Sequence, residues 1–245
     1  MAIGRGTVRT TGVLLLVAGC RTQRESTVDV PNPLNNDVPA QAGTGTLCKS
    51  LGGDIATVTG RKYQWDFDGA FGPPPPEFVV VLGNWQVETE STAPSPPNAL
   101  RQKGAFAVGD FPRALVKDLT FADLTMQVRC RMESGNTDQA CGLVLRAQDG
   151  CNYYVARANA KEGNTRFYLS VNGRRTQIGP TAATPLVPGT WYTLKVIAKG
   201  SDLTISLDGA QVVAFKDTTF ARGKIGLWTK ADSVTAFDAL EASGD

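Results

Sequence analysis

Three neighbouring segments of the chain carry planar polar side chains at every second position. The segments are "ACGLVLRAQDG", "NYYVARANA" and "TRFYLSVNGRR". If each forms a β-strand, alternate side chains share a face, and adjacent strands place their polar rows about 4.8 Å apart. Guanidinium and amide groups supply the paired donors and acceptors that neighbouring hydroxyl groups need, and aromatic rings stack on the C–H face of a sugar. The pattern therefore predicts a carbohydrate-binding sheet face. Its candidate residues are Arg146, Gln148, Tyr153, Arg157, Asn159, Arg166 and Tyr168.

The C-terminal stretch "GLWTKADS" adds an indole and two opposite charges. Trp228, Lys230 and Asp232 lie at alternate positions and could complete the same carbohydrate-binding face. A structural interpretation stays open, because Arg and Tyr also cover the outer faces of ordinary β-sandwiches. In that case Lys230 and Asp232 form a local ion pair, and Trp228 covers the edge of the core.

Carboxyl groups suited to catalysis are harder to assign. A glycosidase needs two of them flanking the scissile bond, about 5–10 Å apart. The chain has no Glu-x-Asp-x-Glu run that would place them on one strand. Asp149 and Asp232 are the weak catalytic candidates, with Glu162 as a further acid, but the sequence cannot pair them. Asp66 and Asp68 in "WDFDG" are expected to shape a turn, with a structural calcium ion as the alternative. We otherwise expect no metal and no cofactor.

Composition excludes several other functions. The 245 residues include no histidine, which removes the usual base of Ser and Cys nucleophile triads and the commonest metal ligand. At a net charge of +2 the chain lacks the basic excess of nucleic-acid-binding proteins. A hydrophobic content of 42% suffices for one substantial core. We therefore expect a single main domain, a monomer and no nucleic-acid partner.

Short segments of alternating polarity follow one another from Arg61 to the C-terminus. In "LTMQVRCRM" the apolar side chains share one face, and "LTISLDG" repeats the pattern. The Asn-Gly pair of "VNGRR" and the Asp-Gly pair of "LDGAQ" are typical of two-residue hairpin turns. No stretch has the i, i+3, i+4, i+7 spacing of an amphipathic helix. The sequence therefore predicts an all-β fold, a two-sheet antiparallel β-sandwich.

The N-terminus has the features of an export signal. Arg5 and Arg9 precede a short apolar stretch that ends in small residues before Cys20. The motif "LLLVAGC" resembles a bacterial lipoprotein signal, whose cleavage leaves Cys20 as the lipid-carrying first residue. An ordinary secretory signal is the alternative. Residues 20–60 are rich in Pro, Asn, Thr and Gly, as in a flexible tether.

These features predict three parts of the chain. They are a signal peptide at residues 1–19, a lipid-anchored flexible linker at 20–60 and a folded domain at 61–245. The protein is then exported and held by its lipid on a membrane, at the outer membrane or facing the periplasm. Its partners would be the membrane, through the lipid, and a carbohydrate or glycoside.

Export would place the other cysteines in an oxidising compartment, where thiols pair. Cys130 and Cys141 flank the turn "ESGNTDQ" and would face each other across a hairpin, which leaves Cys48 and Cys151. Buried free thiols are an equal alternative, because a bridge requires Cα atoms within about 7 Å. The pairing therefore stays open.

Three blocks of sequence resemble a known family. They are "GNWQVETESTAPSPPNALRQ", the stretch from "TFADLTMQVRCRM" to "YLSVNGRR", and "DTTFARGKIGLWTKADSVTAFDAL". From about Tyr63 onward the chain is similar to bacterial exported domains of unknown function grouped with the 3-keto-disaccharide hydrolase family. The resemblance implies a jelly roll of the laminin-G and concanavalin A type, whose concave face is the usual saccharide surface. The residues that match the same types in similar sequences are Gln102, Arg146, Asp149, Asn152, Tyr153, Arg157, Asn159, Arg166, Trp228, Lys230 and Asp232.

The chain also departs from this family pattern. Similar sequences often carry His where this chain has Tyr192, and an acidic pair where it has Asp238 and Ala239. If either position serves catalysis in relatives, this protein binds without turnover.

Three functions therefore remain, and we favour the first. It is carbohydrate binding by a lipid-anchored envelope protein through the Arg, Asn, Tyr and Trp side chains of one sheet face. The second is an enzyme, a hydrolase or lyase acting on 3-keto-disaccharides or related glycosides. There the ketone acidifies the neighbouring C–H, a carboxylate removes that proton, and Arg146 or Lys230 stabilises the enolate. The third is a structural or adhesive envelope domain.

Overall fold

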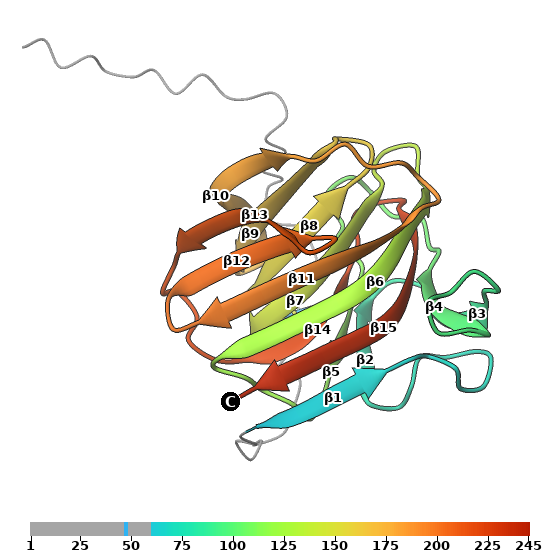
Figure 1. Ribbon diagram of the computed structural model, residues 1–245, viewed down its shortest axis with the longest axis horizontal. Coiled ribbons are helices and arrows are strands. Elements are labelled where there is room, and N and C mark those ends of the chain that lie inside the picture. Colours follow the sequence, from blue (N-terminus) through green and yellow to red (C-terminus); the bar gives the residue numbers. More distant parts are fainter. Residues whose placement is uncertain (1–46, 49–59) are drawn as a thin grey trace, which may run out of the picture. The chain divides into compact units, whose positions relative to one another are not determined.

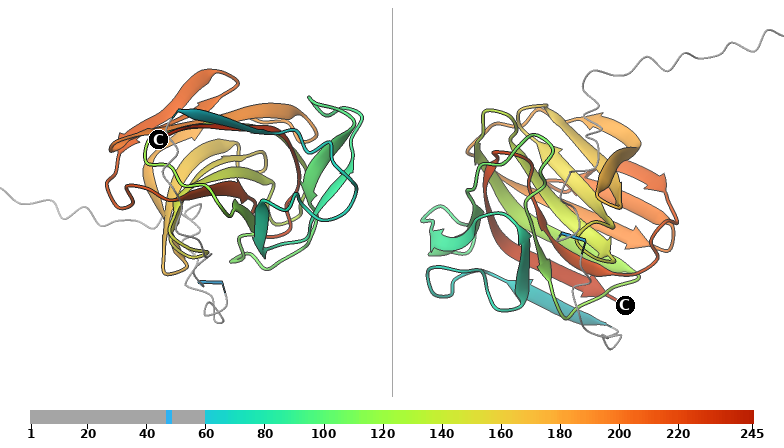
Figure 2. Two further views of the ribbon diagram at one scale, coloured as in Figure 1. Left: turned by 90° about the horizontal axis from the view of Figure 1, so that it is seen from below. Right: turned by 180° about the vertical axis from the view of Figure 1, so that it is seen from behind.

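The computed structural model describes residues 47–48 and 60–245. These residues form two antiparallel β-sheets, and they contain no α-helix. The sheets lie against each other as two curved layers (Figures 1 and 2). The predicted two-sheet antiparallel β-sandwich is therefore confirmed. No helix of the described part is long and apolar enough to span a bilayer. The predicted signal peptide and most of the predicted linker lie outside the described residues.

The first sheet, sheet A, has eight strands. Seven follow one another in the order β13-β12-β11-β6-β15-β4-β3, and β1 pairs with β15. Their bounds are β1 Arg61–Trp65, β3 Trp85–Thr89, β4 Asn98–Gln102, β6 Leu124–Ser134, β11 Trp191–Lys199, β12 Asp202–Leu207, β13 Ala210–Lys216 and β15 Val234–Gly244.

The second sheet, sheet B, has seven strands in the order β10-β9-β8-β7-β14-β5-β2. Their bounds are β2 Phe78–Leu82, β5 Arg113–Val116, β7 Ala140–Ala147, β8 Tyr153–Asn159, β9 Asn164–Val171, β10 Arg174–Ala183 and β14 Lys224–Trp228. In Figure 1 sheet B lies behind sheet A, and its central strands β7, β8 and β9 follow one another in the sequence.

The main core lies between the sheets. On β6 the alternating Met126, Val128, Cys130 and Met132 are fully buried, and the residues between them are half-buried. Sheet B contributes Tyr154 and Phe167, whose rings meet edge to face with centroids 6.0 Å apart. Burying each such large apolar side chain contributes about 1.5–3 kcal/mol. The apolar residues that recur at every second position of the sequence are thus the residues buried between the sheets.

Two hairpins turn at the residues that the sequence predicts. Asn172 and Gly173, between β9 and β10, have φ of 51° and 78°. Asp208 and Gly209, between β12 and β13, have φ of 47° and 85°. Two successive positive φ values define the turn that matches the twist of a two-residue hairpin, and Asn, Asp and Gly adopt them at low cost.

Both candidate cysteine pairs are disulfides. Cys130 and Cys141 have Cα atoms 6.4 Å apart, and Cys48 and Cys151 have Cα atoms 4.9 Å apart. The expected hairpin between Cys130 and Cys141 is absent, because β6 belongs to sheet A and β7 to sheet B. This bond therefore joins the two sheets through the core. The other bond attaches residue 48 to the turn before β8.

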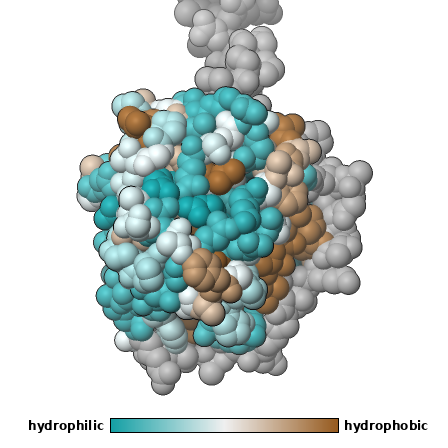
Figure 3. Space-filling model, turned by 90° about the vertical axis from the view of Figure 1, so that its right-hand side faces the viewer, coloured by the Kyte–Doolittle hydropathy of each residue, from teal (hydrophilic) through white to brown (hydrophobic). Residues whose placement is uncertain are grey.

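The outer face of sheet A carries a network of ion pairs. Arg101 contacts Glu88, Glu90 and Glu133 at 2.8–2.9 Å, and Arg131 also pairs with Glu90 and Glu133. The side of the molecule on which β3 and β4 lie is mostly hydrophilic, with separate hydrophobic patches (Figure 3). The charged side chains of this network are therefore paired with one another.

Candidate functional site

The register of β7, β8 and β9 brings the predicted polar rows together. Gly142 pairs with Arg157, and Arg157 pairs with Arg166. Val155 likewise pairs with Tyr168. Paired residues of adjacent strands project from the same face. The residues that alternate with them, such as Tyr154 and Phe167, belong to the core between the sheets. The polar rows therefore lie on the outer face of sheet B, as the sequence predicts.

Three further strands extend this face. Trp228 of β14 pairs with Gly142 on one side and with Arg113 of β5 on the other. Arg175 of β10 pairs with Ser170 of β9. We call the resulting group the arginine–aromatic cluster. It consists of Phe111, Tyr153, Arg157, Arg166, Tyr168, Arg175, Trp228 and Lys230, together with the carboxylates of Asp138 and Glu162. The eight ring-bearing or cationic members are only 0–5% exposed.

Arg175 lies at the centre of the aromatic part. Its guanidinium carbon is 4.2 Å from the ring centroid of Tyr168, 4.4 Å from that of Phe111 and 5.6 Å from that of Trp228. The rings of Phe111 and Trp228 stack with centroids 5.5 Å apart. Cation–π contacts of this kind stabilise a desolvated guanidinium, although burial lowers the pKa of Arg175. The arrangement holds a flat donor among three aromatic faces.

Glu162 is the carboxylate that connects the arginines. Its oxygens lie 3.0 Å from Nη1 of Arg157 and 3.2 Å from Nη1 of Arg166, and 3.8 Å from Nζ of Lys230. Burial raises the pKa of Glu162, but the nearby charges of Arg157 and Lys230 outweigh it and leave the pKa below its usual value. Glu162 is therefore an anion at neutral pH, and its exposed side-chain fraction of 16% makes it the most open charged group of the cluster.

Lys230 forms the most deeply buried ion pair. Its Nζ lies 2.6 Å from Oδ2 of Asp138, and the two side chains are 1% and 2% exposed. Oδ1 of Asp138 accepts a hydrogen bond from Nδ2 of Asn159 at 2.5 Å. Asp138 and Glu162 thus converge on one ammonium group. The local ion pair between Lys230 and Asp232, expected under the structural interpretation, does not form.

The cluster contains buried donors that have no acceptor in the described part of the protein, among them Nε of Arg157 and the indole N–H of Trp228. The indole N–H of Trp228 is fully buried and makes no hydrogen bond within the described residues. A buried donor without a partner costs about 1–3 kcal/mol, so such groups are rare in folded proteins. A ligand oxygen next to this nitrogen would remove that cost.

Arg146 does not lie where the alternation predicts. Its φ of 48° and a register shift in the pairing of β14 with β7 mark a β-bulge. The bulge reverses the alternation, since Leu145 packs in the main core while Ala147 packs with Trp228 on the outer face. The guanidinium of Arg146 donates to the backbone carbonyls of Ala122, Phe220 and Gly200 at 2.7–3.1 Å. The placement of Arg146 in the polar row is therefore corrected, and its contacts are those of a structural residue.

Three other candidates are also held by local backbone contacts. Gln148 donates its side-chain amide to the carbonyls of Arg146 and Arg222. Asp149 accepts the N–H groups of residues 151 and 152 in a turn. Asp232 accepts the N–H groups of residues 136, 137 and 138, and these bonds lower its pKa against the opposing effect of burial. The structure thus places both weak catalytic candidates in turns, and their catalytic role stays a prediction.

Two further expectations concern metal sites and the family pattern. Asp66 accepts the N–H of Asp68 at 3.2 Å, as expected in a turn, whereas Asp68 accepts long-range hydrogen bonds from Ser95 Oγ and from the N–H of Asn98. In the described part of the chain no three His, Cys, Asp or Glu side chains gather as metal ligands would.

Gln102 uses both ends of its amide on backbone groups, including the carbonyl of Ser233. The hydroxyl of Tyr192 accepts the N–H of Val187.

Sequence reasoning missed several members of the cluster. Arg175 could have been placed from the Asn172–Gly173 turn, because a two-residue hairpin pairs residue 170 with 175 and so puts Arg175 beside Tyr168. Phe111 and Asp138 lie outside the strands, and nothing in the local pattern indicates that they approach the face.

The fold resembles solved structures of small β-sandwich domains. The carbohydrate-binding module CBM66 from Bacillus subtilis superposes with a TM-score of 0.58 at 23% identity, over 68% of this chain and 96% of that chain. A Bacillus subtilis protein of unknown function with a galectin-like fold gives a TM-score of 0.50 at 14% identity, over 68% of this chain and 89% of that one. At these identities the likeness shows the fold alone.

The sequence identifies the family. Residues 80–241 match the 3-keto-alpha-glucoside-1,2-lyase-like domain. The chain therefore belongs to this family, which confirms the resemblance seen in its motifs. No sequence among curated proteins matches the chain.

Proposed function

We propose that the arginine–aromatic cluster on the outer face of sheet B binds a carbohydrate or glycoside. The buried indole N–H of Trp228 carries the proposal, because it is a donor without an acceptor among rings and guanidinium groups. A hydroxyl group of the sugar would accept a hydrogen bond from this N–H, and the C–H face of the sugar ring would stack on Tyr168 or Trp228. The family match and the likeness to a carbohydrate-binding module support this choice.

Ligand entry has to expose this face. Because the rings and cations are 0–5% exposed, a sugar must displace contacts that now cover them. The apparent affinity is then reduced by the fraction of molecules in which the face is open. We therefore expect slow hydrogen exchange at the Trp228 indole in the free protein. We also expect weak sugar binding, which becomes stronger as the fraction of molecules with an open face increases.

A comparison of two tryptophan variants tests this proposal. The full-length chain is passed over immobilised glycans and glycosides, and its retention is measured. Trp228→Phe keeps a ring on Phe111 but removes the N–H, so we expect affinity to fall about two- to tenfold. Trp191→Phe, on sheet A, is the matched control and should leave affinity unchanged. Equal affinity of the wild-type and Trp228→Phe proteins, or no retention on any glycan, would refute the proposal.

The second candidate function is cleavage of a 3-keto glycoside. The observation that favours it is the convergence of Glu162 and Asp138 on Lys230. Glu162 would remove the proton beside the ketone, and Lys230 would stabilise the enolate. The enolate would then form a carbon–carbon double bond as the C–O glycosidic bond breaks, and the departing sugar oxygen would take the proton back from Glu162. The lowered pKa of Glu162 makes it a weak base, which is why we place binding first.

Release of reducing sugar from a 3-keto-disaccharide separates the two functions. An enzyme should release sugar in proportion to time and lose that activity in Glu162→Gln. Binding without release would leave the lectin-like role alone. Release that persists in Glu162→Gln would remove this residue from the mechanism.

We also propose that Cys20 carries a lipid that anchors the protein in the cell envelope, with residues 20–60 as a tether. The motif "LLLVAGC" supports this proposal. Labelling with radioactive palmitate should mark the wild-type protein and fail to mark Cys20→Ser. Labelling of Cys20→Ser to the same extent would contradict it.

A further inference from the structure

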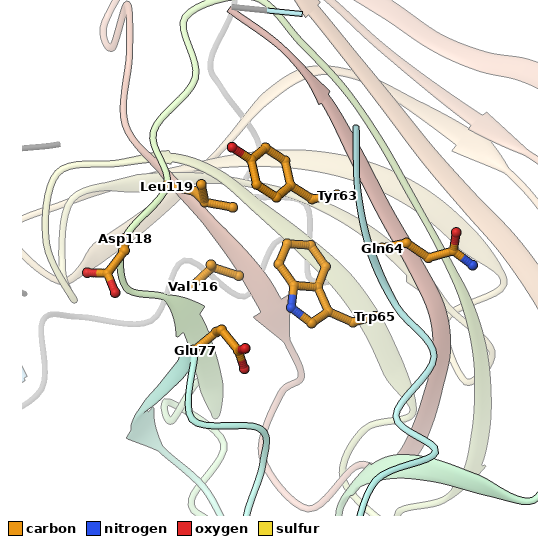
Figure 4. A pocket seen from close by; sticks show the side chains of 7 residues that line it. All are labelled: Tyr63, Gln64, Trp65, Glu77, Val116, Asp118 and Leu119. Carbon is orange, nitrogen blue, oxygen red and sulfur yellow. The ribbon is translucent and has the colours of Figure 1, made fainter. Parts of the chain in front are cut away.

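A pocket lies at an edge of the sandwich, apart from the arginine–aromatic cluster. It has a volume of about 320 Å³ and opens between β1 of sheet A and the end of β5 in sheet B. Figure 4 shows Tyr63 and Trp65 on one side and Val116 and Leu119 on the other. Val116 faces the core, whereas its neighbour Leu115 packs with the cluster, so the two sites lie on different sides of sheet B.

Two aromatic rings form one wall of this pocket. Tyr63 and Trp65 are two positions apart on β1, and their rings are inclined by only 13° with centroids 6.2 Å apart. Figure 4 shows them side by side. Phe121 and Phe78 support them from the core through edge contacts at 6.0 and 5.7 Å. This support holds the rings in place, so the wall is preorganised for a ligand.

Polar groups lie around the aromatic wall. Glu77 and Asp118 are exposed acids that line the pocket. Neither forms an ion pair with a described residue, although the charge of Asp118 acts on Lys224. In Figure 4 the indole nitrogen of Trp65 is on the side of Glu77, and Gln64 points away. The pocket thus combines a flat apolar surface with two acceptors and one donor at its rim.

We infer that this edge pocket binds a chain of pyranose sugars with equatorial substituents. Such a sugar has a flat C–H face that covers one aromatic ring, and two successive units cover two neighbouring rings. Its hydroxyl groups then donate to Glu77 and Asp118 and accept from the Trp65 indole. An organic cation is the other ligand that aromatic rings and carboxylates suit. A cation is best enclosed by rings on several sides, and these two rings lie nearly parallel along one wall. This inference does not depend on the proposed role of the arginine–aromatic cluster.

The test follows the indole N–H signal of Trp65 by NMR in the full-length protein. The signal is assigned as the one lost in Trp65→Phe, and cellohexaose is the probe. We expect the Trp65 signal to move with saturation at millimolar concentration, while the signal of Trp191 stays in place. The Trp228 signal reports on the other site in the same spectrum, so failure of one site is distinguishable from failure of the other.

Two exposed substitutions test the role of the carboxylates. Glu77→Gln together with Asp118→Asn removes no hydrogen bond or ion pair to a described side chain and changes only the charge that Asp118 exerts on Lys224, so the fold should be kept. We expect the affinity for cellohexaose to fall about threefold or more. An unchanged affinity would overturn the inference. So would an unmoved Trp65 signal at about 10 mM cellohexaose, or a signal that moves only with tetramethylammonium chloride, which would identify a cation site instead.

Discussion

The buried pair of Lys230 and Asp138 allows a quantitative test of how the cluster is held together. The two charges are 2.6 Å apart and almost wholly removed from water. Lys230→Met keeps the length of the side chain but leaves Asp138 with only the hydrogen bond from Asn159. Removing one partner of a buried pair costs about 3–5 kcal/mol, because the other charge stays buried without compensation. We expect Lys230→Met to lower the free energy of unfolding by that amount.

A double-mutant cycle separates the pair from its surroundings. Lys230→Met combined with Asp138→Asn removes both charges, and replacing a whole buried pair is often nearly neutral. We therefore expect the double variant to recover about 2 kcal/mol or more of the loss, a coupling that urea unfolding curves measure. Lys216→Met is the control, because its pair with Asp202 is 70% and 59% exposed and should contribute less than about 1 kcal/mol. A cost for Lys230→Met as small as the control, or strictly additive single effects, would refute the reasoning.

Three other predictions concern stability. Burial, with the charges of nearby acids, raises the pKa of Asp238 from 3.8 to about 6. The contribution of Asp238 to the free energy of unfolding is therefore complete below pH 3.8 and is lost as pH rises through 6, a loss of about 3 kcal/mol. Urea unfolding between pH 4 and 7 should show this fall in the wild-type protein and not in Asp238→Asn. Replacing Cys48 and Cys151 by Ser should lower the thermal midpoint, by the equivalent of about 2–4 kcal/mol, and an unchanged midpoint in calorimetry would contradict a structural role. Arg146→Met should destabilise the folded protein by about 1–3 kcal/mol for each carbonyl that loses its donor. Glycan affinity in the retention assay should stay unchanged, because the Arg146 guanidinium binds backbone carbonyls.

The faces of the strands were largely predictable from the sequence. A strand alternates with period two, so the buried Met126 and Val128 and the outward Arg157 and Tyr168 follow from spacing alone. The turn at Asn172 also determines the partner of each residue in its hairpin. The orientation of Arg146 was not predictable in this way, because its positive φ reverses the alternation of the strand. Gly or Asn at this position would have indicated a positive φ, but the residue is Arg.

The cluster itself was only partly predictable. Local spacing indicates which side chains share a face, but it does not indicate which loops approach that face. Asp138 comes from the turn between β6 and β7, and Glu162 from the turn between β8 and β9. Both reach Lys230, which follows β14. The order of the strands in sheet B brings these segments together.

The sequence by itself determined the class of fold, the polarity of each strand face, the hairpin turns and the family, because these depend on local spacing and on motifs. Only the tertiary structure decided which groups are in contact. In the structure a disulfide links Cys130 and Cys141 across the two sheets, and Arg146 binds backbone carbonyls instead of lying in the polar row. Trp228 and Arg175 lie among aromatic rings. Contacts of this kind depend on how distant strands are ordered and how closely they pack, and a pattern that repeats every two residues carries no information about either.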